Sequence, residues 1–424
     1  MNNSVAGKSV SRSIAIYSVA FAVAGGTPFL LLPLLTKYLS PVQFGEVTSF
    51  LMLVVIAGNL AGLSSHGFVS VRYFKTDSGK FSGILSTSVA VVGFAHLVVA
   101  MILIVTFVKL QQIIGLPLGL TLLSIVAALT LSWNNIFLSV FQTTGQPMLY
   151  LRARVIQAAI EVLLCVALIF LFAPTSISRI LSYQIALAAS VLLGFHHCLS
   201  KGYLRGDVTL KDARAVGAFG VPMLPHIAAS TAITYLDRAM VSSLLGVDSL
   251  GIYMVGMQIG MAMIIVIEPL NKALAPWLFS QLATNDAAIR LSVVKKTYLL
   301  YILLVLVGSI IALMAHLFFD LFIGSQYVEA KRLIGWVVAG FVFQGMYYSV
   351  VNYLFYAEKT GRLSVMSTLA AFAGGLISYI LIDKYGLVGA GISFAVNNCI
   401  LFLLVWTAAS RVVPMPWLLA IGRK

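Results

Sequence analysis

The chain has 424 residues, of which 60% are hydrophobic and only 9% are charged, and its formal net charge is +14. Because a soluble chain carries about 25% charged residues, this composition excludes an ordinary soluble protein. In lipid, only helices and closed barrels pair all their backbone amides. The continuous apolar runs of about 20 residues therefore predict spanning helices rather than the short alternating strands of a barrel.

About twelve apolar runs follow one another with short connections, and we predict that each is a spanning helix. In chain order they cover residues 14–36, 47–66, 83–108, 117–141, 154–172, 178–199, 215–236, 249–270, 297–318, 332–356, 363–382 and 387–409. The first run follows Lys8 and contains an Ala-x-Ala pattern at Ala22, which a cleaved signal peptide would also show. It extends to Leu35, beyond the apolar region of a signal peptide, so we interpret it as an uncleaved span.

The positive charge is distributed unevenly between the two ends of the predicted spans. With both termini in the cytoplasm, most of the 27 Lys and Arg residues fall at inner ends. The exceptions are Arg238, near the outer end of the seventh span, and Lys37, Lys109, Arg179, Lys331, Arg332 and Lys384. This is the positive-inside distribution of a multi-pass membrane protein. The net charge therefore indicates orientation in a cell inner membrane and not a nucleic-acid partner.

The chain divides into two halves of six predicted spans each. A polar, basic linker at 201–214 separates an N-terminal lobe, residues 1–200, from a C-terminal lobe, residues 215–424. The segments Leu39–Gly45 and Leu245–Gly251 follow the first span of each half, and both begin with leucine and end with glycine. Such weak similarity at equivalent places indicates a parallel internal repeat, as in many transporters.

The first predicted span of each half is rich in residues that disturb helices. These residues are Gly25, Gly26, Pro28 and Pro33 in the first span, and Gly217, Gly220, Pro222 and Pro225 in the seventh. Interrupted helices at corresponding places in two halves point to a substrate site, because they expose backbone groups at the repeat interface. The alternative is the ordinary tolerance of membrane helices for proline.

A few ionisable residues fall within the predicted spans, where they are costly unless they face the protein interior. Glu161 lies in the fifth span and is predicted to be either a coupling-ion site or a helix–helix hydrogen bond. Asp237 and Arg238 end the seventh span and cannot share one helix face, so we expect one to pair and the other to face a cavity, unless both are interfacial anchors. Glu268 lies less deep, near the inner end of the eighth span. Interior roles with satisfied hydrogen bonds, rather than a proton relay, are expected for His66, His96, His226 and His316.

Glycine pairs and methionines in the spans predict helix packing. Gly58 and Gly62, and again Gly256 and Gly260, form Gly-x-x-x-Gly patterns that permit close helix contact. Methionines of the eighth span share one face, which a copper path would also show, but packing is the interpretation we favour. These methionines are Met254, Met257 and Met261.

Motifs of soluble enzymes are not found. The sequence Gly7-Lys8-Ser9 lacks the earlier glycine of a phosphate-binding loop, and no zinc-protease or serine-hydrolase motif occurs. The three cysteines, Cys165, Cys198 and Cys399, have no spacing that indicates disulfides or a metal. The sequence therefore predicts neither an enzyme nor a cofactor, and no nucleotide hydrolysis.

Four short motifs, in order, give the chain a family resemblance. They are Leu34–Pro41 with Phe44-Gly45; Asp237-Arg238 with Leu244–Gly246 and Gly251–Tyr253; Glu358–Gly361; and Lys384–Ala390. In these motifs the chain resembles the Wzx-type polysaccharide (O-antigen) flippases of the multidrug/oligosaccharidyl-lipid/polysaccharide exporter superfamily. The resemblance covers nearly the whole chain and implies an all-α bundle of six plus six helices around a central cavity.

The resemblance also implies a function in lipopolysaccharide biosynthesis. Members are thought to move a polyprenyl-diphosphate-linked oligosaccharide from the inner to the outer leaflet by alternating access. Basic side chains facing the cavity would bind the diphosphate, and the candidates are Lys37, Arg238 and Lys272. A coupling ion, proton or sodium, would use Glu161, Asp237 or Glu268. The expected partners are thus the lipid-linked oligosaccharide, membrane lipid and this ion.

Two other functions are open. An ion-coupled multidrug exporter of the same superfamily would benefit from carboxylates in the first half, but the first 200 residues contain only Glu46, Asp77 and Glu161. A membrane glycan polymerase would need a substantial external loop, and the connections here are short. Both alternatives are therefore less favoured than the flippase.

Reporter fusions test the predicted topology. A reporter enzyme that is active only outside the cytoplasm should be inactive when fused after Lys424 and active when inserted within 320–331, because these sites lie at opposite ends of the spans. Activity of the fusion after Lys424, at an expression level equal to the inserted one, would contradict the twelve-span arrangement with both termini inside.

Overall fold

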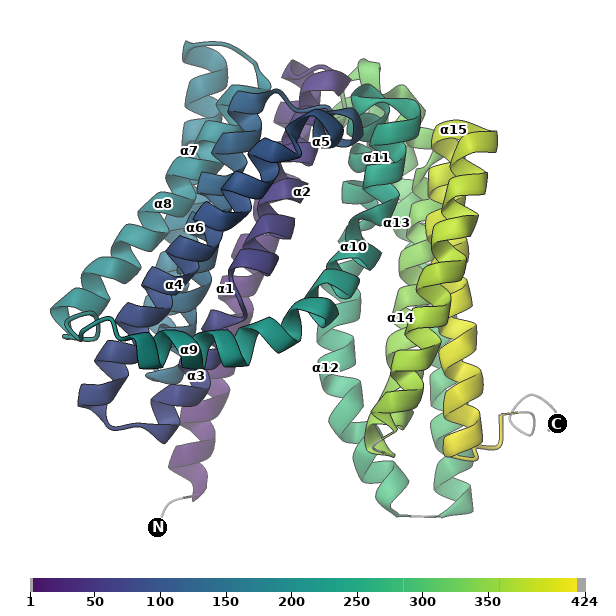
Figure 1. Cartoon of the computed structure of the whole chain (residues 1–424). Coiled ribbons are helices and arrows are strands. Elements are labelled where there is room, and N and C mark those ends of the chain that lie inside the picture. Colours follow the sequence, from purple (N-terminus) through teal and green to yellow (C-terminus); the bar gives the residue numbers. More distant parts are fainter. Residues whose placement is uncertain (1–2, 285, 358, 418–424) are drawn as a thin grey trace. The chain divides into compact units, whose positions relative to one another are not determined.

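The computed structural model describes residues 3–284, 286–357 and 359–417 (Figure 1). All elements within these ranges are helical, and no strand occurs in them. Ten helical segments of the described chain are long and apolar enough to cross a membrane. The prediction of an all-α, multi-pass membrane protein is thus confirmed. Some residues named above, or their side chains, lie outside the described part: Gly7, Lys8, Ser9, His226, Glu358 and Lys424.

The chain forms two compact units, Met1–Tyr235 and Leu236–Lys424, whose boundary falls within one helix, α10. This boundary lies beyond the predicted linker 201–214, and the predicted lobes of six spans each stay a prediction. The first unit contains α1 (Asn3–Tyr38), α2 (Pro41–Ala61), α3 (Ser65–Lys75), α4 (Ser78–Val105), α5 (Phe107–Ile114), α6 (Leu118–Thr143), α7 (Pro147–Leu171), α8 (Ser176–Ser200), α9 (Leu210–Gly220), η1 (Val221–Met223) and the first half of α10 (Leu224–Leu245).

Helix α6 is the centre of the first unit, where α2, α3, α4, α7 and α8 all pack against it. Its apolar side chains, such as Phe137, form a buried cluster with residues of α4 and α8. Gly194 of α8 lies directly against Phe137, because the absent side chain lets the two helices approach. Gly58 of α2 faces the α6 backbone at Ala128 in the same way, so the predicted packing role of this glycine is confirmed.

The segment before α10 differs from the prediction. A single seventh span at 215–236 is wrong, because α9 ends at Gly220, a 3₁₀ turn follows, and α10 starts at Leu224. Two prolines, Pro222 and Pro225, explain the break, since each lacks an amide donor for the helix. Helix α9 runs across the ends of α3 and α4 (Figure 1), where Val216 joins a buried cluster with residues of both.

The first span of the chain also differs from the expectation of an interrupted helix. Helix α1 stays helical through both Pro28 and Pro33. Hydroxyls near these prolines bond to backbone carbonyls: Thr27 donates to the carbonyl of Val23 at 3.0 Å and Thr36 to that of Leu32 at 2.9 Å. Both hydroxyls therefore find hydrogen-bond acceptors within α1 itself.

The second unit contains the remainder of α10, then α11 (Val247–Gly260), α12 (Ala262–Ala283), α13 (Ala287–Phe322), η2 (Ser325–Arg332), α14 (Ile334–Tyr356) and α15 (Thr360–Val412). The predicted eighth span, 249–270, is wrong as one helix, because α11 ends at Gly260 and α12 continues to Ala283. The predicted last two spans are the two legs of α15, which folds back at Gly386. This glycine has φ 58° and ψ −136°, a conformation that other residues rarely adopt.

Helix α14 is the centre of the second unit and packs against α11, α12, α13, η2 and α15. Gly260 of α11 lies against Val337 and Phe341 of α14, and Gly256 lies against Leu333, so the predicted packing role of this glycine pair is confirmed. Helices α6 and α14 correspond to the fourth predicted span of each half. Each unit is therefore built around the equivalent element.

Replacement of Gly194 by alanine tests the packing of α8 on α6. The new Cβ would lie 2.6 Å from the Cβ of Phe137, so a helix must move, and we expect a loss of about 1–3 kcal/mol in the free energy of unfolding. The matched control is Gly119→Ala, since nothing lies within 4 Å of that position on α6. Thermal melting of the purified protein in detergent measures both. Equal melting temperatures for the two variants would show that this contact is not tight.

Candidate functional site

The buried charge of the second unit lies on α10. Asp237 and Arg238 are adjacent there, and the Arg238 residue is only 8% exposed. One carboxylate oxygen of Asp237 accepts a hydrogen bond from the backbone amide of Arg238 at 2.8 Å. The other accepts from the hydroxyl of Tyr253 on α11 at 2.6 Å. The acid is thus engaged by a neighbouring helix, while the guanidinium places a positive charge in the interior.

The other predicted pair of this unit lies on α12. Lys272 Nζ is 3.8 Å from the carboxylate of Glu268, one helical turn earlier. The lysine side chain is 70% exposed and the glutamate side chain 33%. A loose, solvated pair of this kind contributes about 0–0.5 kcal/mol to stability. Both charges are therefore accessible to other ions.

Glu161 of the first unit forms a buried ion pair. Its carboxylate accepts a 2.7 Å hydrogen bond from the guanidinium of Arg179, and α7 and α8 carry the two residues. Both side chains are less than a tenth exposed. The two predicted roles of Glu161 were a coupling-ion site and a helix–helix hydrogen bond, and this geometry supports the second. Arg179 lies in the first turn of α8, at the end of the sixth predicted span where the sequence placed it, and it is buried there.

A polar stripe on α7 leads to this ion pair. Tyr150, Arg154, Gln157 and Glu161 follow one another at three- or four-residue spacing, which places them on one face of the helix. Arg154 bonds to Gln157 at 3.3 Å and lies 5.8 Å from the ring of Tyr150. Tyr17 of α1 packs edge-on against the same ring, with centroids 5.2 Å apart. The interface of α1 and α7 is thus polar and aromatic.

Sequence reasoning missed three of these residues, namely Arg154, Arg179 and Tyr253. The sequence contains features that indicate a role for the two arginines, but each feature also fits another interpretation. An acid within a span requires a cation, and Arg179 begins the next helix of the hairpin. Arg154 was counted only as an inner-end charge.

The remaining predicted residues have simpler surroundings. Lys37 lies in the last turn of α1 and is exposed. His96 is buried, with one ring nitrogen 2.8 Å from the carbonyl of Val92 and the other 3.4 Å from the hydroxyl of Ser132. The expectation of a satisfied interior role for His96 is confirmed. Among the described residues, no cluster of three His, Cys, Asp or Glu forms a metal site.

A double-mutant cycle tests the Glu161–Arg179 pair. Glu161→Gln and Arg179→Met each leave one polar or charged partner buried alone, so each should lower the free energy of unfolding by about 3–5 kcal/mol. The double variant should lose less than the sum of the two. As a matched control, Asp320→Asn breaks the exposed Lys331–Asp320 pair and should lower the free energy of unfolding by less than about 1 kcal/mol. Additive losses in the cycle would show that the two charges do not interact.

Known structures show the fold. Over 95% of this chain and 98% of the other, the structure is similar to an inward-facing multidrug resistance MATE family transporter of the MOP superfamily, with a TM-score of 0.69 and 14% identity. Over 93% and 87%, it is similar to the lipid II flippase MurJ in an inward closed conformation, with a TM-score of 0.70 and 14% identity. The fold is therefore that of these membrane transporters.

Sequence relatives point in the same direction. An uncharacterized membrane protein of Haemophilus influenzae is 28% identical over 382 residues, which are 87% of this chain and 91% of that protein. A putative O-antigen transporter of Shigella flexneri is 24% identical over 226 residues, about half of each chain. The family model described as polysaccharide biosynthesis protein matches residues 10–283, more than half of the chain. The resemblance to the polysaccharide flippases is thus confirmed, and the chain belongs to the polysaccharide biosynthesis protein family.

Proposed function

We propose that this protein moves a polyprenyl-diphosphate-linked oligosaccharide across the inner membrane by alternating access, with both termini in the cytoplasm. The family match, the similarity to an O-antigen transporter and the fold shared with a lipid II flippase support this proposal. The substrate has two parts with different needs. Its diphosphate requires cations, and its glycan requires a polar path through the bilayer.

The observation that carries the proposal is the buried guanidinium of Arg238. A positive charge held inside a membrane protein attracts an anionic ligand. Its neighbour Asp237 is held by Tyr253 and by a backbone amide, which fixes the acid on the α11 side. The planar fork of arginine suits two phosphate oxygens. We expect the exposed Lys37 and Lys272 to attract the diphosphate as point charges.

The distribution of carboxylates favours an anionic substrate over an organic cation. A multidrug exporter would use an accessible acid in the first unit. The three acids of the first 200 residues are otherwise placed: Glu161 is paired with Arg179, Glu46 accepts a 2.5 Å bond from the hydroxyl of Ser176, and Asp77 is exposed at the start of α4. A glycan polymerase is less favoured still, because the described connections between helices are short.

Transport requires a source of free energy, and we propose an ion gradient or the flux of substrate. Of the three predicted coupling acids, Glu161 has the strongest partner and Asp237 has two hydrogen-bond donors. Glu268 makes a loose, partly exposed contact to Lys272, and we propose that it is the acid best able to exchange a proton or sodium ion. No nucleotide hydrolysis is part of the proposal.

Substitution of Arg238 tests the role of its charge. In cells that lack their own flippase and depend on this chain, Arg238→Gln should reduce surface glycan display about tenfold or more, since a charge-assisted contact to phosphate is lost. Arg238→Lys should retain much of the display, because it keeps the charge but not the fork. Surface glycan is measured by lectin or antibody binding at equal protein level.

The matched control is Arg332→Gln, which removes an exposed arginine at the end of η2 and should leave display unchanged. Melting temperatures of the purified variants separate a folding defect from a binding defect. If Arg238→Gln displays glycan as well as the parent protein does, Arg238 has no role in diphosphate recognition. Restored drug resistance without glycan display would favour the multidrug exporter.

A further inference from the structure

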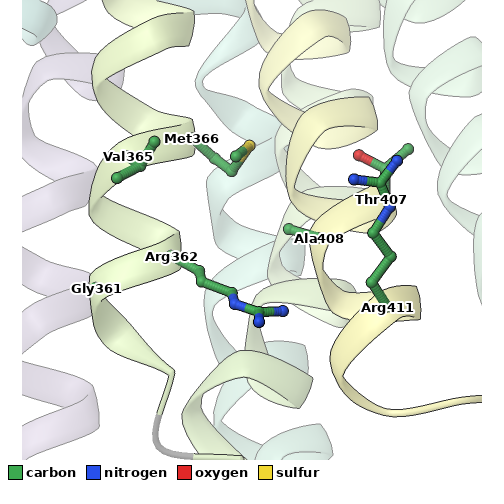
Figure 2. Close-up of a pocket in the computed structure, with 7 residues that line it drawn as sticks. All are labelled: Gly361, Arg362, Val365, Met366, Thr407, Ala408 and Arg411. Carbon is green, nitrogen blue, oxygen red and sulfur yellow. The ribbon is translucent and has the colours of Figure 1, made fainter.

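A basic pocket lies between the two legs of α15, far along the chain from the residues discussed so far (Figure 2). Because α15 folds back at Gly386, its first and last turns come together. The pocket has a volume of about 490 Å³. Its walls are formed by Gly361, Arg362, Val365, Met366, Thr407, Ala408 and Arg411. All of these residues belong to the second unit, so the pocket is complete within that unit.

Two arginines give the pocket its charge. Arg362 extends from the first leg toward the second leg, which carries Arg411 (Figure 2). Both residues are exposed. The ion pairs of the described chain are those of Arg179, Lys272 and Lys331, and they include neither of these arginines. The two positive charges that line the pocket repel each other, and an anion bound between them would attract both and offset this repulsion.

The remainder of the wall is apolar. Val365, Met366 and Ala408 line the pocket beside the arginines. From Val365, a stripe of exposed apolar side chains follows the first leg at four- and three-residue spacing, on one helix face. Its members are Val365, Leu369, Phe372 and Leu376, with exposed fractions of 54%, 53%, 78% and 64%. On a helix that spans a membrane, this stripe is suited to a hydrocarbon chain.

The predicted topology places the pocket at the cytoplasmic face. Arg362 and Arg411 are both at inner ends of predicted spans. Anionic lipids of the inner leaflet attract basic side chains at this depth, with a free energy of about 1 kcal/mol for each Lys or Arg. The charged pocket continues into an apolar stripe, so it matches both the headgroup and the hydrocarbon chain of an amphiphile. A soluble phosphate would use only the pocket.

We propose that this pocket binds the phosphate headgroup of an anionic lipid of the inner leaflet, held by Arg362 and Arg411. The hydrocarbon chain of the lipid lies along the stripe from Val365 to Leu376. The proposal is independent of the transported substrate, since it needs only a chain that spans the membrane. A resident phospholipid and a polyprenyl diphosphate share the chemistry in question, namely a phosphate joined to a long apolar chain.

Native mass spectrometry of the full chain in detergent measures the binding. Phosphatidylglycerol should bind the parent protein more tightly than phosphatidylcholine with the same acyl chains. The double variant Arg362→Gln/Arg411→Gln should weaken phosphatidylglycerol binding about tenfold and leave phosphatidylcholine binding unchanged. Arg362→Lys/Arg411→Lys should lie between the two. The control Arg152→Gln/Lys295→Gln removes the same charge at exposed positions elsewhere and should bind like the parent.

Competition distinguishes the sources of the ligand. Persistence of phosphatidylglycerol in the presence of an equimolar polyprenyl diphosphate would assign the pocket to a resident phospholipid and support the proposal. Displacement by the polyprenyl diphosphate would assign the pocket to the lipid-linked substrate and overturn the proposal. Displacement by millimolar inorganic phosphate would overturn it, because the chain would then contribute nothing. Equal binding by the parent and the double glutamine variant, or an equal loss in the control, would overturn it as well.

Discussion

Polar groups that enter the hydrocarbon region of a bilayer must find their partners inside the protein, and this requirement organises both compact units. In the first unit, α6 bonds to α2 through Ser132 and to α8 through Asn134. In the second, α14 bonds to α13 through Ser349 and to α12 through Asn352. The two central helices, α6 and α14, therefore also form hydrogen bonds that link them to their neighbouring helices. Small residues on their neighbours, such as Gly194, then allow close contact.

The same requirement decides which charges are open to a ligand. In the first unit, the carboxylate of Glu161 is paired with Arg179 and is therefore not available to an organic cation. In the second unit Tyr253 holds Asp237, and Arg238 carries positive charge into the interior. An anionic substrate fits this arrangement better than a cationic one. Arg362 and Arg411, near the two ends of α15, are exposed and line one pocket.

Hydropathy predicted most of the spans, because a helix that crosses a bilayer needs a run of about 20 apolar residues. It failed around the seventh and eighth spans, where α9 lies across the bundle and α11 is too short to be counted as a span. The hydropathy of a segment does not show whether its helix crosses the membrane or runs across the ends of other helices. The burial of Arg179 could not be predicted from the sequence either. A residue near the end of a span is expected to be exposed to water, and the partner of Arg179, Glu161, is brought to it only by the packing of α7 against α8. Asp237 and Arg238 were found because ionisable residues are rare in spans.

Reconstituted transport tests directly whether the protein moves a lipid-linked oligosaccharide across a bilayer. The purified chain would be placed in liposomes that carry a polyprenyl-diphosphate-linked oligosaccharide in one leaflet, and the appearance of the glycan in the other leaflet would be followed with a membrane-impermeant lectin. We expect transfer to be faster than in protein-free liposomes, to need no nucleotide and to be strongly reduced in Arg238→Gln. Transfer at the protein-free rate, in liposomes where the same chain moves an organic cation, would contradict the proposed function.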